Sequence, residues 1–352
     1  MLESLLETRR TSSTRYLTGA GSLTQLRAWL DPLPARVPII ADADAWRAHG
    51  EEIAETLAPA QVVVQCIHGE IDKELDAVER LAAGLATQRV RRREKILVVG
   101  GGACCDLGGL VALLYMRGMD YAIVATSLMA QVDAAIGGKV GCNGATRKNL
   151  LGGFHGASLV VMDPRFLSTV PPRYARAALA EVVKLGLILP ESDVLDYLDA
   201  YVNGNENAIT PMVARCVDGK LSLLADDPTE RDLDRLLNLG HAVAHALEKV
   251  CGIDIVHGEA VAVGIAATAR YAAIEGHCLP ENAERIANRL RLLGLPVSSD
   301  VDFLELCDRL GEIPDHRGGH MRLVVPTGDR GVRITRHTNV ALLARCVSPR
   351  SA

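Results

Sequence analysis

The residues that could do chemistry include histidines placed along apolar, helix-like segments. LNLGHAVAHALEKV holds His241 and His245 four residues apart, and VHGEAVAVG holds His257 at the start of another apolar run. Residues i and i+4 share one face of a helix. ALAEVVK places Glu181 and Lys184 on an otherwise apolar face, and a buried carboxylate requires a cationic partner or a metal ion. Two histidines and one glutamate would make a zinc shell with a coordination position open for substrate hydroxyls.

A glycine-rich segment carries a second group of polar residues. MAQVDAAIGGKVGCNGATRKNLLGGF contains Asp133, Lys139, Arg147, Lys148 and Asn149. Glycines allow the backbone to fold around a ligand, and the cations could hold a phosphate or a carboxylate. A solvated basic loop is the alternative. The apolar and glycine neighbours of Lys139 favour an anion-binding pocket.

A run of glycines directly follows a buried apolar strand in KILVVGGGACCDLGG. Free backbone N–H groups at such a turn, without Cβ atoms, let a pyrophosphate approach, although a plain tight connection would use the same residues. Asp42 and Asp44 end an earlier strand, and HGEIDKE adds Glu70 and Lys73. These side chains could contact the ribose and adenine of a dinucleotide, or they could be ordinary loop polarity.

The elements that must position these residues change in kind along the chain. Apolar strand-like runs alternate with helical stretches in the first half, which favours a parallel sheet covered by helices. From about Pro171 the pattern becomes long amphipathic or alanine-rich helices. We therefore expect an NAD-binding α/β domain over residues 1–165 and a mainly helical metal- and substrate-binding domain over residues 166–352. The expected strands cover residues 37–42, 61–67, 95–102, 121–126 and 158–163.

Composition limits the class of protein. The 352 residues carry a net charge of -5 with no basic block, which gives no electrostatic argument for nucleic acid or an anionic membrane as a partner. No apolar stretch reaches the roughly 20 residues of a membrane span, and MLESLLETRR lacks the basic start of a signal peptide. The nine cysteines include no CxxC pair. These features predict a cytoplasmic protein with reduced thiols.

Taken together, these motifs resemble those of dehydroquinate synthase and its sugar phosphate cyclase relatives. GGGACCDLGGLVALLYMRG, TSLMAQVDAAIGGKVG, RKNLLGGF, LAEVVK, LNLGHAVAH and HGEAVAVG occur in that family's order and spacing, over residues 37–270. The resemblance implies a Rossmann-like sheet domain, a helical metal-binding domain, NAD+, and Zn2+ or Co2+ as cofactors. It also implies a small sugar phosphate as the substrate.

The resemblance further assigns roles to single residues. It makes Glu181, His241 and His257 the metal ligands. The residues implied to hold NAD are Asp42, Glu70, Lys73, Gly101, Gly102, Asp106, Thr126, Ser127, Lys148 and Thr169. The implied catalytic residues are Asp133, Lys139, Lys184, Asn238 and His245, and the implied substrate-binding residues are Arg117, Asn149, Lys220, Asp234 and Arg317. Arg117 would reach the phosphate bound by the neighbouring subunit, which implies a homodimer.

The family's chemistry would proceed through transient oxidation of a secondary alcohol by NAD+. The new ketone acidifies the adjacent C–H, phosphate leaves by elimination, and the hydride returns. The ring then opens and closes again by an intramolecular aldol addition. The protein would mainly supply orientation and electrostatics, since cofactor and metal carry the difficult steps.

One position departs from the dehydroquinate synthase pattern. Those enzymes have an arginine four residues before the Asn of LNxGH, where it grips the substrate carboxylate, and this chain has Asp234 there. An acid would repel a carboxylate and suits a hydroxyl, as in the relatives that cyclise sedoheptulose 7-phosphate. Asn238 and His245 are retained, which favours the 2-epi-valiolone synthase type. Arg231 or Arg235 could still bind a carboxylate.

A second departure concerns the family's C-terminal lysine pair, which His316 and Arg317 replace here. Four alternatives to a sedoheptulose 7-phosphate cyclase stay open, and one of them is an α/β protein whose polar residues are only structural. A dehydroquinate or aminodehydroquinate synthase would share most motifs but not Asp234. A metal-dependent polyol dehydrogenase would share the fold and the HxxxH helix and would need neither Lys139 nor Lys184. A non-catalytic NAD-binding regulator would have little reason to keep a full set of metal ligands.

Overall fold

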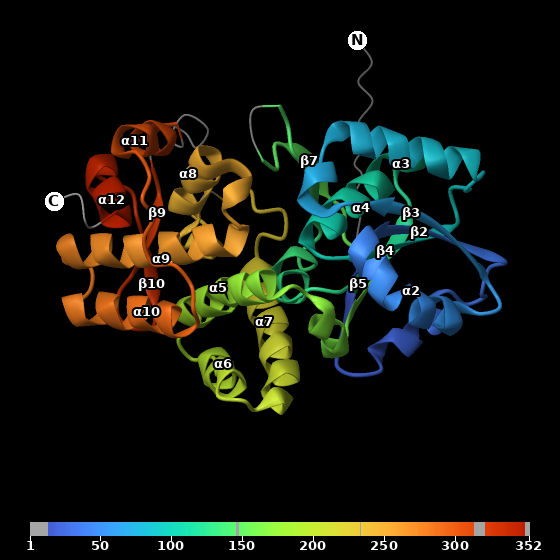
Figure 1. Cartoon of the computed structure of the whole chain (residues 1–352), viewed down its shortest axis with the longest axis horizontal. Helices are drawn as coiled ribbons and strands as arrows, with labels where there is room; N and C mark the ends of the chain where they lie inside the picture. Colours follow the sequence, from blue (N-terminus) through green and yellow to red (C-terminus); the bar gives the residue numbers. More distant parts are fainter. Residues whose placement is uncertain (1–12, 146–147, 233, 313–320, 349–352) are drawn as a thin grey trace, which may run out of the picture.

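A computed structural model of the chain describes residues 13–145, 148–232, 234–312 and 321–348. Its main sheet has six strands in the order β1-β8-β5-β4-β2-β3, and all neighbours pair in parallel. The sheet occupies one half of the elongated molecule, and helices occupy most of the other half (Figure 1). The six strands are β1 (Arg15–Thr18), β2 (Arg36–Asp42), β3 (Gln61–Ile67), β4 (Lys95–Gly100), β5 (Asp120–Ala125) and β8 (Leu159–Met162).

Successive side chains of a strand point to opposite faces of the sheet, and in this sheet the side chains on both faces are buried. Ile39 and Leu97 belong to one apolar cluster, whereas the adjoining Ile40 and Val98 belong to another. The first cluster is closed by α1 (Gln25–Trp29) and α2 (Ala43–Leu57), and the second by α3 (Leu75–Thr87) and α4 (Gly102–Leu114). Continuous apolar runs are thus what a doubly covered parallel sheet needs.

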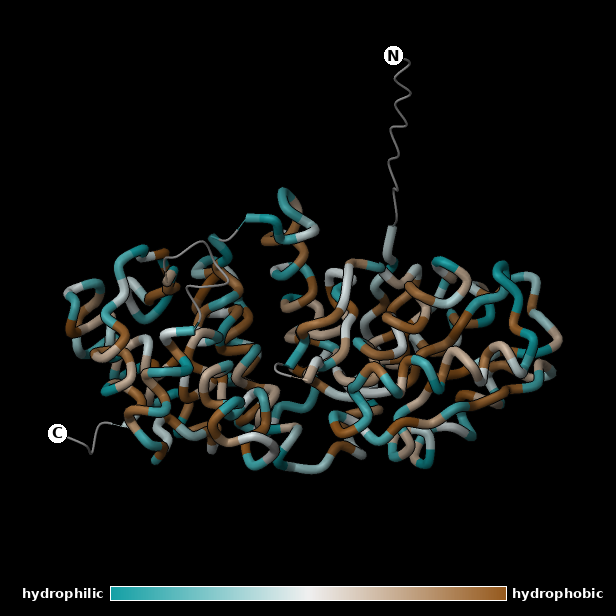
Figure 2. Tube along the Cα trace, turned by 90° about the horizontal axis from the view of Figure 1, so that it is seen from above, coloured by the Kyte–Doolittle hydropathy of each residue, from teal (hydrophilic) through white to brown (hydrophobic). Residues whose placement is uncertain are grey.

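The second half of the chain is built mainly from helices that pack around α9. The helix α9 (His257–Ile274) contacts α5, α8, α10 and α12. Figure 2 shows hydrophobic segments in both halves of the molecule, and one buried apolar cluster runs from a face of the sheet into the helical half. The other helices are α5 (Pro172–Ile188), α6 (Val194–Val202), α7 (Ile209–Leu224), α8 (His241–Cys251), α10 (Pro280–Leu292), α11 (Phe303–Gly311) and α12 (Val340–Val347).

Two short antiparallel pairs complete the fold. The strands β6 (Lys139–Cys142) and β7 (Leu151–Phe154) form a hairpin that packs on α4. The strands β9 (Leu323–Pro326) and β10 (Val332–Thr335) pack beside α9 and the short 3-10 helix η7 (Leu236–Asn238). Both pairs lie next to segments that carry predicted site residues.

The predicted fold class is confirmed: a parallel sheet covered by helices precedes a mainly helical region. All five expected strands are present, and β1, β6, β7, β9 and β10 were not expected from the sequence. The expected boundary at residue 165 falls inside the 3-10 helix η5 (Pro164–Thr169) and stays a prediction. Within the described ranges, no helix has the length and apolar character needed to cross a bilayer.

Candidate active site

Three helices bring the predicted metal ligands together. Glu181 lies in the middle of α5 and is 0% exposed, while His241 and His257 are the first residues of α8 and α9. The start of α8 can lie against α9 because Gly240 adopts φ 77°. A Cβ at Gly240 would stand 2.8 Å from the backbone nitrogen of Ile265, so only glycine fits this approach.

The distances within this group suit a shared cation. The Nε2 atoms of His241 and His257 each lie 3.7 Å from Oε1 of Glu181. One ligand atom from each of the three residues lies within 4.8 Å of the others. Oε2 of Glu181 pairs with the ammonium of Lys184, whereas Oε1 is buried with the two imidazole nitrogens at 3.7 Å and no hydrogen bond among the described contacts, a state that a bound cation would relieve. The donor set and its geometry therefore fit a catalytic zinc or cobalt ion.

The other nitrogen of each imidazole is held by an acceptor. Nδ1 of His241 lies 3.1 Å from the carbonyl oxygen of Leu239, and Nδ1 of His257 lies 3.2 Å from Oε1 of Glu248. An acceptor on Nδ1 keeps the proton there and leaves the Nε2 lone pair for a metal ion. Both rings are therefore oriented as ligands.

The protonation of the cluster follows from burial and its charges. Burial, reinforced by the nearby Lys184 ammonium, lowers the pKa of His241 to about 3, so this ring is neutral. Burial opposes a charge on His257, but hydrogen bonds to Glu181 and Glu248 raise its pKa to about 10. Burial also opposes ionisation of Glu181, yet Lys184 lowers the pKa of this carboxyl below its usual value. Glu181 is thus an anion ready to bind a cation.

Two buried lysines lie beside this cluster and share Asp133. Lys184 Nζ contacts Oε2 of Glu181 and lies 3.9 Å from Oδ1 of Asp133. Lys220 Nζ donates to Oδ1 and to the main-chain oxygen of Asp133, both at 2.7 Å. Asp133 lies on a π-helical turn, Ala130–Ala134, in which Ala135 N donates to the carbonyl oxygen of Ala130. Such turns are frequent at functional sites.

The structure also describes three more predicted catalytic residues, two of them near the predicted metal ligands. Asn238 ends η7, which directly precedes α8, and the ring of His245 stands edge-on to that of His241 at 5.5 Å. Lys139 begins β6 and pairs with the buried carboxylate of Glu230. Arg235 also pairs with Glu230, at 3.0 Å. The sequence did not single out Glu230, which is the partner of one predicted catalytic lysine.

The residues predicted to hold NAD gather at the carboxyl edge of the sheet. Gly101 and Gly102 follow β4, Asp42 ends β2, and Thr126 and Ser127 follow β5. A Cβ at Gly101 would stand 3.1 Å from Oγ of Ser127, so these turns lie side by side. The carboxylate of Asp42 caps α2 and also accepts a hydrogen bond from Gly69 N. Ligands of parallel α/β sheets bind at this edge.

A second polar group links this edge to the β6–β7 hairpin. Lys73 is buried, and its Nζ donates to Oδ2 of Asp106 at 2.6 Å and to Oδ1 of Asn149 at 2.5 Å. Glu70 accepts a hydrogen bond from Asn143 at 3.0 Å. Asn149, predicted to bind substrate, therefore lies with the residues predicted to bind NAD.

Lys148 and Thr169 lie apart from that group. Lys148 Nζ is 3.3 Å from Oε1 of Glu248, on the metal-binding side of the molecule. Thr169 is the last residue of η5, and its hydroxyl oxygen lies 2.8 Å from Nε2 of His49. Neither residue is hydrogen-bonded to the glycine turn among the described contacts.

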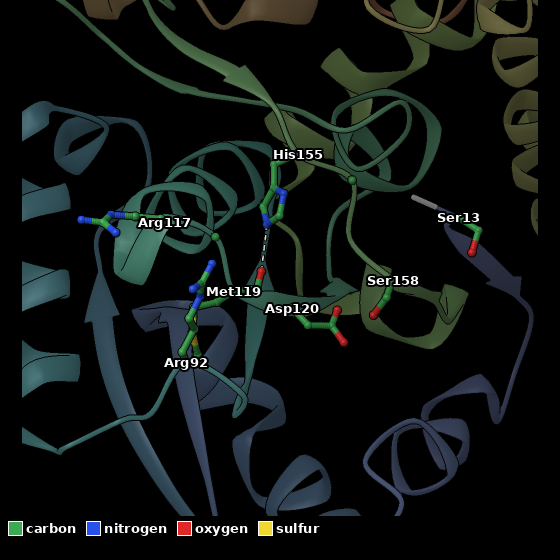
Figure 3. A pocket seen from close by; sticks show the side chains of 9 residues that line it. Ser13, Arg92, Arg117, Met119, Asp120, His155 and Ser158 are labelled. Atoms are coloured by element: carbon green, nitrogen blue, oxygen red, sulfur yellow. Dashed lines mark hydrogen bonds between the residues drawn. The ribbon is translucent and has the colours of Figure 1, made fainter. Parts of the chain in front are cut away.

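Arg117 lines a separate open cavity of about 360 Å³ (Figure 3). His155 accompanies it there, held by a 2.8 Å contact between its Nε2 and the carbonyl oxygen of Met119. Among the described residues, no other predicted site residue lines this cavity. The lining residues are Ser13, Arg92, Arg117, Gly118, Met119, Asp120, His155, Gly156 and Ser158.

Asp234 is engaged by two arginines that sequence reasoning did not find. Its Oδ1 lies 2.9 Å from Nε of Arg322, and its Oδ2 pairs with Arg336. Hydrogen bonding to Arg336, aided by the charge of Arg322, lowers the pKa of Asp234, so this group is an anion. Asp234, Arg322 and Arg336 together carry one net positive charge. The expectation that Asp234 repels a substrate carboxylate therefore does not take account of the two arginines beside it. Arg317 and His316 lie outside the described residues.

The sequence contained one unused signal for a further residue. Glu248 lies seven residues after His241 and three after His245 on α8, so the helix period places all three on one face. No such periodic signal exists for Glu230, Arg322 or Arg336, because they reach their partners from separate segments.

Comparisons with known proteins agree over most of the chain. A family model for the N-terminal part of 3-dehydroquinate synthase matches residues 63–177, and one for its C-terminal part matches residues 178–312. The 2-epi-valiolone synthase of Stigmatella aurantiaca is 38% identical over 332 residues, covering 88% of this chain and 82% of that protein. The 3-dehydroquinate synthase of Ruegeria pomeroyi is 36% identical over 307 residues, covering 84% of this chain and 81% of that protein.

A solved structure extends the likeness to three dimensions. The 2-epi-5-epi-valiolone synthase of Streptomyces hygroscopicus subsp. jinggangensis, solved with NAD+ and Zn2+ bound, superposes with a TM-score of 0.91 at 28% identity. The match covers 99% of this chain and 100% of that one.

Proposed function

Because this chain belongs to the 3-dehydroquinate synthase family, we propose that it is an NAD- and metal-dependent sugar phosphate cyclase acting on sedoheptulose 7-phosphate. The product would be a valiolone-type C7 cyclitol, formed with release of phosphate. The observation that carries the proposal is the convergence of Glu181, His241 and His257 beside the ammonium of Lys184. The similar 2-epi-valiolone synthase supports a valiolone-type product.

When bound, NAD+ would supply reversible hydride transfer, and the metal ion would polarise a substrate hydroxyl. The chain itself supplies charge and orientation. Lys139, Lys184 and Lys220 present ammonium groups suited to the phosphate and hydroxyls of a sugar phosphate. Asp133 fixes Lys220 through two of its oxygens, so that ammonium is held in one place before substrate binds.

We further propose a homodimer in which Arg117 serves the active site of the partner. Arg117 is exposed and lines a cavity that holds no other predicted site residue among those described. Leu114 and Met116 beside it, and Leu151 and Phe154 on the hairpin that packs on α4, are exposed apolar side chains. Exposed apolar residues of this kind are typical of subunit interfaces.

A second candidate substrate is the phosphorylated heptulosonate used by 3-dehydroquinate synthases. Arg322 and Arg336 favour it, because they keep positive charge around Asp234, where those enzymes use an arginine. The 3-dehydroquinate synthase from Ruegeria pomeroyi is also nearly as similar as the valiolone synthase. Substrate identity therefore requires a direct comparison.

The test supplies the purified protein with NAD+ and either Zn2+ or Co2+, and gives it each sugar phosphate separately. Phosphate release is measured, and the product is identified by NMR. We expect release from sedoheptulose 7-phosphate, with no sustained NADH absorbance because the hydride returns. Release only from the heptulosonate would establish the second candidate. Accumulating NADH with a plain polyol would identify a dehydrogenase, and His257→Ala serves as the inactive control.

A further inference from the structure

Glu248 is a buried carboxylate that the sequence-based assignments did not include. It lies on α8 and is 7% exposed. Its Oε1 lies 3.2 Å from Nδ1 of His257 and 3.3 Å from Nζ of Lys148. A buried carboxylate is costly without such partners, so its position is determined by what it contacts.

Glu248 contacts His257 on the side of the imidazole ring that faces away from Glu181. Nε2 of His257 faces Glu181, and Nδ1 on the opposite side of the ring faces Glu248. A carboxylate on Nδ1 fixes the orientation of the ring, keeps the proton on Nδ1 and makes Nε2 a better donor to a metal ion. Among the described contacts, Nδ1 of His241 has the neutral carbonyl oxygen of Leu239 as its acceptor instead.

We propose that Glu248 is a positioning residue of the metal centre that holds His257 as a ligand. The proposal rests on the proposed function, because it takes Glu181, His241 and His257 to be the metal ligands. The anionic carboxylate gives His257 a stronger hold than the neutral carbonyl gives His241. Loss of Glu248 therefore weakens metal binding through the orientation of one ring.

Lys148 connects this carboxylate to the sheet half of the molecule. It lies in the connection between β6 and β7, and the next residue, Asn149, accepts a hydrogen bond from the buried Lys73. Adjacent residues of one loop thus contact the metal-ligand side and the glycine-turn side of the site. Lys148 fixes Glu248 without touching His257, so its removal has a smaller effect on metal binding than removal of Glu248.

The experiment measures metal affinity of the full-length protein without any substrate. The metal-free protein and its variants are titrated with Zn2+ against a chromophoric chelator, and with Co2+ by its visible absorption, which reports coordination geometry. We expect Glu248→Ala to weaken Zn2+ binding by about 10–100-fold, the usual effect of losing such a partner. Glu248→Gln, which keeps an oxygen acceptor, should recover part of the loss, and Lys148→Ala should weaken binding less than Glu248→Ala.

Glu312→Ala is the matched control. Glu312 pairs with Lys249, the residue that follows Glu248 on α8, but does not contact a metal ligand. This variant should bind Zn2+ as the unchanged protein does. Circular dichroism and melting of each metal-free variant report folding. If Glu248→Ala does not fold, the Zn2+ affinities of Glu248→Gln and Lys148→Ala are compared with that of the control instead. Weaker binding in both variants than in the control would support the proposal, and equal binding would overturn it.

Unchanged Zn2+ affinity and an unchanged Co2+ spectrum in folded Glu248→Ala would overturn the positioning role and leave the cyclase proposal standing. Tight metal binding by the unchanged protein with no turnover of either sugar phosphate would overturn the cyclase proposal alone. Absence of metal binding by the unchanged protein would overturn both.

Discussion

Lys184 provides the sharpest test of how the cluster is stabilised without metal. Its ammonium is 2% exposed and contacts the carboxylate of Glu181, which is itself fully buried. Lys184→Met keeps the length and apolar stem of the side chain but removes the charge. In the metal-free protein, the partners of Glu181 among the described residues would then be the imidazoles of His241 and His257, each at 3.7 Å.

The expected loss can be estimated from that change. Breaking one side of a buried ion pair costs about 3–5 kcal/mol, and the charge on His257 offsets part of it, so we expect about 3 kcal/mol. For a chain of 352 residues, that corresponds to a melting temperature lower by about 4 °C. A bound divalent ion would replace the missing positive charge beside Glu181. Saturating Zn2+ should therefore stabilise Lys184→Met more than the unchanged protein.

The assay compares melting of the metal-free and Zn2+-saturated forms of both proteins. Lys249→Met is the matched control, because Lys249 pairs with Glu312 near the surface, and partly exposed pairs contribute at most about 1 kcal/mol. The reasoning is refuted if metal-free Lys184→Met melts within about 2 °C of the unchanged protein, or if Zn2+ stabilises it less.

Three further outcomes are expected. Subunits carrying Arg117→Ala or His257→Ala should each be inactive alone, and mixing equal amounts should restore about 25% of activity if Arg117 serves the partner's site. The reason is that half of the dimers are mixed and each mixed dimer has one intact site. No recovery of activity in confirmed mixed dimers would exclude that arrangement. Asp234→Asn should leave the positive charge of Arg322 and Arg336 uncompensated. The kcat/KM for the heptulosonate should then rise several-fold relative to the kcat/KM for sedoheptulose 7-phosphate. An unchanged ratio would show that Asp234 does not select the substrate. Burial opposes ionisation of Asp163, but hydrogen bonds from Arg165 and Gly21 N lower its pKa, so the ionised carboxylate stabilises the fold above pH about 4 and this effect fades below. Between about pH 5 and 3, chemical denaturation should therefore show the unchanged protein losing more stability than Asp163→Asn. Equal losses in the two proteins would contradict this.

The sequence predicted the central sheet well because its strands are buried on both faces. Continuous apolar runs such as the one around Ile39 and Ile40 indicate this arrangement directly. The strand β1 was missed because Arg15–Thr18 is a short edge strand with little apolar pattern. The hairpin strands β6 and β7 were missed because glycines interrupt both of them.

The metal cluster was predictable for a related reason. An acid inside an apolar helix, as at Glu181, and histidines at the start of apolar helices, as at His241 and His257, stand out against their surroundings. The partners Glu230 and Arg336 do not, because polar residues in loops carry no period that marks a contact. Their roles depend on which loops the fold places together, as with Arg336 and Asp234, which are 102 positions apart.

The π-helical turn that carries Asp133 makes the length of its segment as important as its residues. Its hydrogen bond from Ala135 N to the carbonyl oxygen of Ala130 spans one residue more than an α-helical bond, so a single deletion within Ala130–Ala134 would move the aspartate away from Lys220 even if every polar side chain were kept. Insertions and deletions should therefore be far less acceptable there than substitutions of its apolar residues. A designer who transplants this site into another scaffold would have to copy the irregular backbone along with the side chains.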